Sequence, residues 1–494
     1  MISRRRLLAA SVALPLAASV AGCVRHPSAP AVGTTRPLPI PPLTTGQVGA
    51  DGVRRFELTA RTGTTEMLPG KATPTWGYNG SVLGPALRAR RGERVAFTIT
   101  NNLPEATTVH WHGMRVPARC DGGPHQTIEA GGTWSPEWTV DQPAATLWYH
   151  PHPHGSTEKH VYRGLSGFFL IDDEHADGLD LPRRYGVDDI PLVIQDRRFA
   201  ADGRLDETDS STYGLLGDTI ITNGISDAHL SVRTERVRLR ILNGSSSRLF
   251  NLARSDDRPF DLIATDGGFL EKPLSLSRMQ LSPGERAEIV LELRAGQTLT
   301  LRSLPIEPRA GLSDPAEFGF DDTFDILTLR AAPQLTPSPA LPGALATITP
   351  LGAAATTRSF ELQWYMINGQ RMDMNRIDLT VQAGATEVWE VRNADNWPHN
   401  FHIHDVRFQV IGIDGLPPPQ ALSGWKDTVY TEPGRTYTLA MRFSGHTDPT
   451  YPYMYHCHLL HHEDQGMMGQ FLVLGPGQQP APMVMSGNDS GHGH

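Results

Sequence analysis

The sequence predicts an all-β fold built from three β-sandwich domains, and two observations favour this class. The chain has 494 residues, which is room for about three domains of ordinary size. It contains 48 glycines and 40 prolines, a large share for a globular protein, and helical periodicity is weak throughout. Short apolar runs bounded by Gly, Pro, Asn and Asp are typical of many short strands joined by tight turns.

A ten-residue strand pattern recurs along the chain at long intervals. Residues 92–101 alternate apolar and polar side chains, as expected for a half-buried strand, and the segment ends at Asn101. Similar segments end at Asn243 and Asn393, which lie 142 and then 150 residues further along. This spacing predicts three copies of one domain.

The first and third copies carry histidine pairs that the middle copy lacks. Nine residues after Asn101 and Asn393 stand His110 and His402, each the first member of a His-x-His pair, whereas Leu252 holds the matching position in the middle copy. We therefore expect a metal centre between the first and third domains, with the second domain as a spacer and wall.

Composition shifts place the domain boundaries. The charged segment 172–189 indicates a first linker, and the Pro- and Ala-rich segment 331–352 indicates a second. We expect five segments after the leader and tether: domain 1 over 51–175, domain 2 without metal ligands over 188–332, a linker over 333–357, domain 3 over 358–475 and a flexible tail over 476–494.

The N-terminus is typical of an export signal. Arg4 and Arg5 precede an apolar stretch that ends at Gly22, too short to span a bilayer comfortably, and Cys23 follows. The arginines resemble a twin-arginine signal over 1–22, and the end of the stretch resembles a lipoprotein cleavage site; ordinary cleavage with Cys23 as a bystander is the alternative. A proline-rich tether is expected over 23–50, so the sequence predicts an exported protein, periplasmic or on the cell surface and held at a membrane by lipid.

Charge and cysteine content exclude other classes. The formal net charge is −9, which argues against a broad electrostatic hold on nucleic acid. Apart from Cys23, the chain contains only Cys120 and Cys457, so there is no disulfide framework. We interpret Cys120 as a buried small apolar residue, and a Cys120–Cys457 bridge is the alternative. We expect a monomer.

The histidines near the C-terminus have the spacing of metal ligands. In a strand His456 and His458 share one face and Cys457 takes the other, so one strand can serve two metal centres. Cys457 is followed by His462 and Met467, and a thiolate, two imidazoles and a weak thioether form a blue-copper site. The missing imidazole is best supplied by His399. Zinc is the rival metal, but the absence of a second thiolate favours copper.

Four His-x-His pairs are expected to converge on the opposite face. Eight imidazoles are too many for one ion and suit three copper ions. The pairs are His110/His112, His150/His152, His402/His404 and His456/His458.

Together these motifs resemble the signatures of the multicopper oxidases, most closely the three-domain bacterial laccases and the copper-efflux oxidase. The resemblance covers about residues 50–475 and implies cupredoxin-like Greek-key sandwiches with four copper ions, one type 1, one type 2 and two type 3. It implies four one-electron oxidations coupled to reduction of dioxygen to water. Carried over by position, the type 1 ligands are His399, Cys457, His462 and Met467; the type 2 ligands are His110 and His402; the type 3 ligands are His112, His150, His152, His404, His456 and His458.

Three acids match family positions near these centres. Asp121 and Glu463 are interpreted as proton donors, the alternatives being a turn residue and a hydrogen-bond partner of a ligand. Asp395 is expected near the type 1 copper, where it would accept a phenolic proton or assist a metal ion; a turn residue is the alternative.

The donor is predicted to be a phenol or a similar aromatic molecule. The segment 331–358 contains no methionine, where copper-efflux oxidases carry a methionine-rich insertion. Trp397 stands where those enzymes have a methionine, and the local sequence resembles bilirubin oxidase. The indole of Trp397 can stack on an aromatic donor. Met366, Met372 and Met374 keep a cuprous or ferrous oxidase as the alternative. A non-catalytic copper-binding or cell-division protein of the same fold is the alternative of another class.

Overall fold

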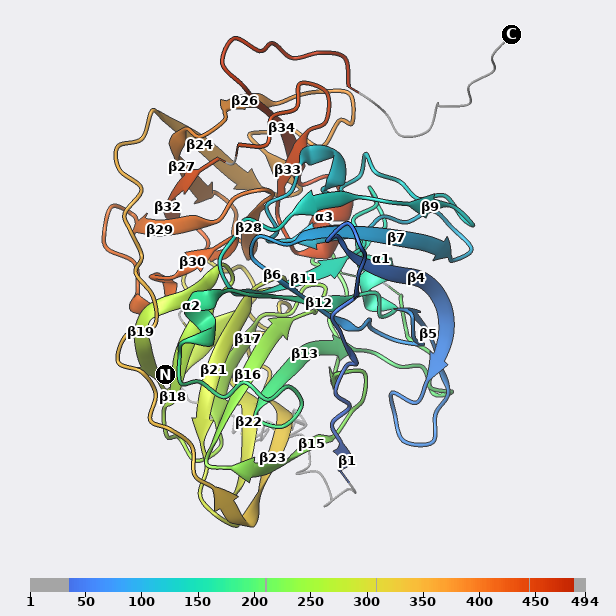
Figure 1. The fold of residues 1–494 in the computed structure, drawn as a ribbon, viewed down its shortest axis with the longest axis vertical. Coiled ribbons are helices and arrows are strands. Elements are labelled where there is room, and N and C mark those ends of the chain that lie inside the picture. The colour runs from blue at the N-terminus through green and yellow to red at the C-terminus, as the bar shows by residue number, and fades with distance from the viewer. Residues whose placement is uncertain (1–34, 209–210, 308, 444, 484–494) are drawn as a thin grey trace, which may run out of the picture. The chain divides into compact units, whose positions relative to one another are not determined.

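The structure is a computed structural model that describes residues 35–483 except 209–210, 308 and 444. Its strands form six sheets, two for each of three sandwiches, so the predicted all-β fold is confirmed. Figure 1 draws the strands mostly in blue to teal for the first sandwich, green to yellow for the second and orange to red for the third. Among the described residues, no helix combines the length and the apolar character needed to cross a membrane.

The first sandwich is formed by two sheets with an aromatic core between them, which includes Phe97 and Phe169. One sheet contains β3 (Gln47–Val48), β4 (Arg54–Thr65), β5 (Thr73–Tyr78), β7 (Arg94–Asn102), β9 (Thr133–Trp134) and β10 (Glu137–Thr139). The other has the order β2 (Leu43–Thr44), β6 (Ala86–Arg90), β12 (Gly167–Asp172), β11 (Ala145–His150) and β8 (His110–His112).

The second sandwich has two six-stranded sheets around an aliphatic core that includes Leu239 and Leu329. One has the order β1 (Arg36–Pro37), β15 (Ala228–Thr234), β23 (Phe324–Thr336), β22 (Thr298–Ser303), β17 (Phe250–Arg254) and β20 (Met279–Leu281). The other has the order β14 (Thr219–Thr222), β13 (Asp189–Arg197), β16 (Arg236–Asn243), β21 (Arg286–Glu292), β18 (Phe260–Thr265) and β19 (Gly268–Leu276).

The third sandwich also has two sheets, around a core that includes Trp389 and Phe401. One sheet has the order β25 (Met366–Ile367), β24 (Thr356–Gln363), β27 (Thr386–Asn393), β32 (Thr436–Arg442), β29 (Phe408–Ile413) and β30 (Trp425–Lys426). The other has the order β26 (Leu379–Gln382), β34 (Met468–Leu474), β33 (Tyr453–His456), β28 (His399–Ile403) and β31 (Thr428–Thr431). The helices are short: α1 (Thr157–Tyr162), α2 (Glu174–Asp177) and α3 (Leu460–Asp464).

The repeated asparagine ends the same strand in each sandwich and forms the same turn. Asn101, Asn243 and Asn393 are all fully buried at the ends of β7, β16 and β27. Each side-chain oxygen accepts the backbone N–H two residues later, at 2.9, 3.1 and 2.9 Å. Each amide nitrogen donates to two backbone carbonyls. The sequence repeat therefore marks a buried hydrogen-bonding device that turns the chain out of its strand.

Part of the segment expected to be a tether is instead paired into the sheets. β1, β2 and β3 each form an edge of a sheet, and β1 runs parallel to β15 of the second sandwich. Edge strands tolerate proline because one side of the strand needs no ladder hydrogen bonds. Pro37 sits between Arg36 and Leu38, whose N–H groups donate to Asp227 and His229. The expected tether is therefore wrong over residues 36–48; the leader, Cys23 and the start of the tether lie outside the described residues.

Candidate metal centre

Strand pairing brings the histidine pairs into register. β8 and β11 are antiparallel neighbours in which His110 faces His150, and β28 and β33 are antiparallel neighbours in which His402 faces His456. Alternation along β8 places His112 on the same face as His110. His152, His404 and His458 follow just beyond the ends of β11, β28 and β33. Residues far apart in the chain thus meet between the first and third sandwiches.

The eight paired histidines are all buried, and all but His458 fall in groups whose ring nitrogens are close enough to share a metal ion. In one group the Nε2 atom of His456 lies 3.2 Å from that of His152 and 3.3 Å from that of His404. In a second group the His112 and His150 rings lie 4.8 and 5.2 Å from the His458 ring, measured between centroids. The centroids of the His110 and His402 rings lie 6.0 Å apart.

Hydrogen bonds determine which ring nitrogen faces the cluster. In four of the histidines Nδ1 lies 2.8–3.1 Å from a backbone carbonyl oxygen, so Nδ1 carries the proton and Nε2 is left with a lone pair. These four are His110, His150, His402 and His456. His112 is reversed: its Nε2 lies 3.0 Å from a carboxylate oxygen of Asp427, which leaves Nδ1 toward the cluster.

The cluster fits metal ions because its donor atoms lack other partners. Among the described residues, the Nε2 atoms of His110, His402 and His458 are buried and accept no hydrogen bond. Burial lowers the pKa of these three histidines well below the ordinary value, so each ring is neutral. A buried, unpaired lone pair is costly, and neutral imidazole is the form that binds a metal. Copper is therefore well suited to this donor set.

A second candidate centre surrounds Cys457, in the loop after β33. Its sulfur lies 3.7 Å from the Nδ1 atoms of both His399 and His462, and those two atoms are 3.0 Å apart. Met467 is fully buried in the same core, and its carbonyl accepts the backbone N–H of Cys457 at 3.1 Å. Burial raises the pKa of the Cys457 thiol to about 12, so a thiolate here needs a bound cation. Cys120 is buried and free, and the described residues contain no disulfide.

Asp121 touches the cluster twice. Its carbonyl binds Nδ1 of His110, and its carboxylate Oδ2 lies 2.7 Å from Nδ1 of His404. The following Gly122 has φ +76°, and a Cβ there would lie 1.7 Å from the carbonyl oxygen of Val109. Only glycine fits this turn, so the turn holds Asp121 against the histidines. Burial raises the pKa of Asp121 to about 6.

Glu463 lies on the opposite side of the cluster, in α3. Its two carboxylate oxygens are each 3.2 Å from an Nδ1 atom, one of His152 and one of His456. The residue before it, His462, belongs to the cysteine centre. α3 therefore carries side chains that reach both centres within one helical turn.

Asp395 acts in a turn and also contacts the cysteine centre. Its oxygens accept the backbone N–H groups of Trp364 and Asn396, at 2.5 and 2.8 Å. One of them also lies 3.4 Å from Nε2 of His399. The side chain is only 6% exposed, so a donor in solvent would have little access to it.

Two residues that position the proposed histidine ligands were not predicted from the sequence. Asp427 accepts hydrogen bonds from buried Arg286 of the second sandwich, and its own carbonyl binds His402. Asn400 accepts the backbone N–H of His458 at 2.5 Å and donates to Ser282 at 3.1 Å. Asp427 stands in no recognisable motif. The only sequence feature that marks Asn400 is an amide side chain within a strand whose residues are all buried.

Aromatic rings surround His462. The His462 ring is fully buried, and its centroid lies 5.4 Å from Tyr365, 5.6 Å from Tyr213 and 6.1 Å from Trp397. Trp364, whose ring lies 5.9 Å from that of Trp397, is 57% exposed. An aromatic wall therefore extends from solvent to the imidazole.

Comparisons with known proteins point to one family. Two family models described as multicopper oxidase match residues 59–176 and 345–476. The multicopper oxidase mco of Staphylococcus haemolyticus is 37% identical over 435 residues, which cover 86% of this chain and 89% of that protein. The cell division protein FtsP of Escherichia coli is 35% identical over 482 residues, covering 96% of this chain and 99% of that protein. The crystal structure of a laccase from Pediococcus acidilactici superposes with a TM-score of 0.81 at 35% identity, covering 90% of this chain and 94% of that one.

Proposed function

The chain belongs to the multicopper oxidase family, and from this premise we propose that it oxidises phenolic and similar aromatic donors and reduces dioxygen to water, as a laccase does. The observation that carries the choice of donor is the aromatic wall over His462. A flat aromatic donor stacks on such rings and comes within a short distance of the buried imidazole.

We assign four copper ions to the two centres. His399, Cys457, His462 and Met467 would hold one ion, and the eight paired histidines would hold three. Bound copper would supply the one-electron redox chemistry. Cys457 is joined through the backbone to His456 and His458, so the chain itself provides a covalent path between the centres.

Proton supply is assigned to the two buried acids. Reduction of dioxygen to two waters consumes four electrons and four protons, so groups that hold protons beside the cluster are needed. Oδ2 of Asp121 contacts His404, and the carboxylate of Glu463 lies against His152 and His456. Each acid would hold a proton at these atoms and pass it inward, and each also orients the rings it touches.

A cuprous oxidase is the second candidate, favoured by one observation. The backbone N–H of Met372 donates to the carbonyl of Gly466, directly before Met467, at 2.8 Å. Met372, which is half-buried, thus lies beside the segment that carries the cysteine centre. Thioethers bind cuprous ion well. The cuprous ion would be a substrate here.

Oxygen uptake by the copper-loaded protein tests these alternatives. We expect a higher kcat/KM for 2,6-dimethoxyphenol than for cuprous or ferrous ion. Replacing either Trp397 or Tyr365 by Leu should lower the phenol value roughly fivefold, since one aromatic stack contributes about 1 kcal/mol. Trp134→Leu in β9 is the matched control and should change nothing. A cuprous value far above the phenol value, without added copper, overturns the proposal. Full copper content with no uptake for any donor would favour a non-catalytic protein.

We also propose export by the twin-arginine route and tethering through Cys23, which lies outside the described residues. One acyl chain anchors a protein only marginally, so more than one is implied. Replacing Cys23 by Ala should move the protein from the membrane fraction to the soluble fraction, measured by fractionation and immunoblotting. Unchanged fractionation would mean that the cysteine is not lipidated.

A further inference from the structure

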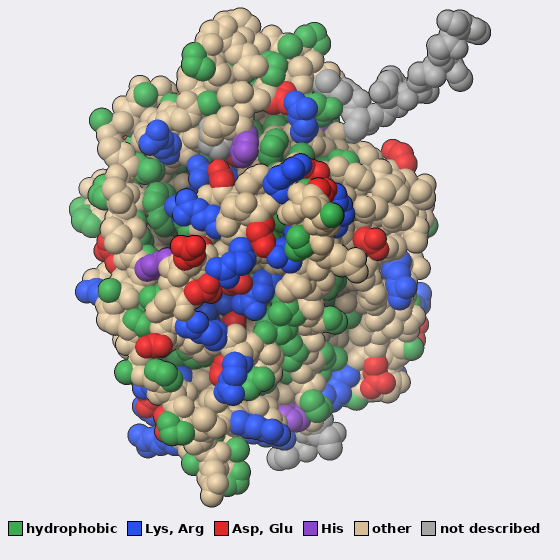
Figure 2. All heavy atoms as spheres, viewed as in Figure 1, with side chains coloured by type: hydrophobic (Ala, Val, Ile, Leu, Met, Phe, Trp, Pro, Cys, Tyr) green, Lys and Arg blue, Asp and Glu red, His purple; other side chains and the backbone are tan. Residues whose placement is uncertain are grey.

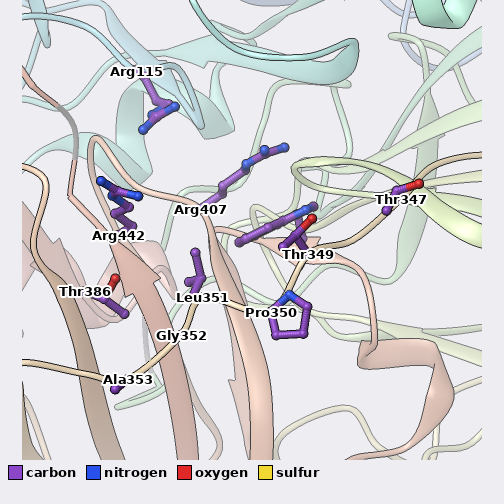
Figure 3. Close-up of a pocket in the computed structure, with 11 residues that line it drawn as sticks. Arg115, Thr347, Thr349, Pro350, Leu351, Gly352, Ala353, Thr386, Arg407 and Arg442 are labelled. Atoms are coloured by element: carbon purple, nitrogen blue, oxygen red, sulfur yellow. The ribbon is translucent and has the colours of Figure 1, made fainter.

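An arginine-lined pocket lies away from the histidines, where the first sandwich, the second linker and the third sandwich meet. Its volume is about 550 Å³, within the usual range of small-molecule sites. Arg115 comes from the first sandwich, Arg407 and Arg442 come from the third, and residues 347–353 of the linker form one wall. Figure 3 shows Arg115, Arg407 and Arg442 around this space, with Leu351 and Thr386 below them.

The pocket wall is positively charged and has no acid of its own. Its lining contains three arginines and no Asp or Glu. Among the described residues, none of the three arginines forms an ion pair within 4.0 Å. On the face drawn in Figure 2, by contrast, basic side chains are interspersed with acidic ones. Asp141, outside the lining, is close enough to act on the charge of Arg407. Three guanidinium groups in one hollow, without an ion-paired acid, are still unexpected in a chain of net charge −9.

Two of the three guanidinium groups are held in place by the protein, and the third has an unpaired nitrogen. Arg407 stacks on the ring of Trp425 at 4.4 Å and donates to the carbonyl of Gly267 at 3.1 Å. Arg442 donates from Nε to the carbonyl of Gly384 at 3.0 Å, which leaves its outer N–H groups for another acceptor. Nε of Arg115 is buried and has no hydrogen-bond partner among the described residues. Burial, together with the charges of Arg115 and Arg91, lowers the pKa of Arg407 to about 10, so an anion here would relieve both effects.

We propose that this pocket binds a small molecule that carries at least two phosphate or carboxylate groups. Guanidinium groups bind both oxyanions through paired hydrogen bonds, and the hydroxyls of Thr347, Thr349 and Thr386 add further donors. A single inorganic anion would leave most of the volume empty and two of the three charges unmatched. The site is a hollow rather than an extended basic ridge, so a compact ligand fits it better than a nucleic-acid strand does.

Ligand binding at this pocket would stabilise the junction between the first sandwich, the second linker and the third sandwich. Trp425 is followed two residues later by Asp427, which contacts His112 and His402. The ligand would therefore sit beside the segment that holds the cluster, without touching a proposed copper ligand.

Isothermal titration calorimetry on the copper-loaded full chain tests the proposal independently of oxidase activity. The probes are pyrophosphate and tricarballylate at constant ionic strength, which separate phosphate from carboxylate recognition. We expect saturable binding of one molecule per chain for at least one probe. Arg115→Ala and Arg442→Ala should each weaken it at least tenfold.

Arg392→Ala is the matched control, because Arg392 is an exposed arginine of the third sandwich outside the pocket. It should leave the affinity unchanged. If a probe only chelated copper, its calorimetric signal would be the same in all three variants. Binding at the pocket would instead weaken in Arg115→Ala and Arg442→Ala alone. Absence of saturable binding for both probes, or equal affinity in the three variants, overturns the proposal. Binding of an RNA oligomer with no binding of either small anion overturns it as well.

Discussion

Asp427 contacts several parts of the site at once, although no motif marks it. Its carbonyl orients His402, and its carboxylate lies against His112 and accepts hydrogen bonds from Arg286. Asp427 and Arg286 are buried. A charge in this position is stable only while its partner is present, so the metal centre depends on an ion pair contributed by the second sandwich.

Removing the charge of Asp427 should therefore destabilise the whole chain. We expect Asp427→Asn to lower the free energy of unfolding by roughly 3 kcal/mol, because buried Arg286 would keep only Asp266, which lies 3.8 Å away and also pairs with Lys426. Urea unfolding followed by fluorescence measures the change. Asp414→Asn is the control: its ion pair with Arg435 is about 40% exposed, so the loss should stay below about 1 kcal/mol. Equal losses would contradict the argument.

The Cys457 thiolate should give the copper-loaded protein its colour. We expect wild-type protein to be blue, and Cys457→Ser to be colourless and to lose oxidase activity while the paired histidines still bind metal. Visible absorption together with copper quantitation measures both effects. Cys120→Ser should stay blue, because that buried thiol lies in the core of the first sandwich and bonds the backbone carbonyl of Glu137. A colourless wild-type protein with full copper content would refute this assignment.

At the scale of elements, two short helices join the first sandwich to the third. α1 follows the His150/His152 pair, and α3 carries His462 and Glu463. The carboxylate of Asp464, at the end of α3, accepts the N–H groups of Thr157 and Glu158, at 2.8 and 2.9 Å. The first turn of α1 is thus capped by a residue more than 300 positions away in the sequence, beside the cluster.

Loss of this cap should loosen α1 without unfolding the protein. Asp464→Ala should cost about 1–2 kcal/mol, as other caps do, and hydrogen exchange should speed up in residues 157–162. Asp173, which caps α2 through the N–H of Ala176 at 2.7 Å, provides the comparison. Asp173→Ala should speed up exchange in α2 and at Ala144, whose N–H also donates to Asp173, and leave α1 unchanged. Unchanged exchange in α1 after the Asp464 substitution would show that the cap contributes nothing.

On the scale of the whole molecule, the histidine cluster is an interface between two repeats, with the third repeat as support. The first and third sandwiches supply all eight paired histidines. The second supplies Arg286, and also Gly284, where a Cβ would lie only 2.9 Å from Nδ1 of His458, so the missing side chain leaves room for that ring. Bound metal would therefore hold the first and third sandwiches together.

Copper removal should lower the stability of this interface. Ligand binding stabilises a folded protein by about 4 kcal/mol at a thousandfold excess over Kd, so the copper-loaded protein should unfold at a clearly higher temperature than the metal-free protein. Differential scanning calorimetry before and after chelation measures the shift. His402→Ala should show a smaller shift. An identical unfolding temperature with and without copper would contradict the bridging role.

The sequence by itself determined the fold class and the faces of the strands, because both depend on local periodicity. Alternation within a strand separates Cys457 from His456 and His458, and the repeat that ends in Asn101, Asn243 and Asn393 reveals three related domains. The positions of the His-x-His pairs in the sequence also indicated that the first and third domains carry the clustered histidines.

Only the tertiary structure decided which groups hold those side chains. Asp427, Arg286 and Asn400 reach the site from separate strands and loops, and such contacts leave no local pattern. The same reason applies to the pairing of residues 36–48 at sheet edges and to the junction that gathers Arg115, Arg407 and Arg442. Local spacing predicts which side chains share a face; what lies opposite that face is set by how distant segments pack.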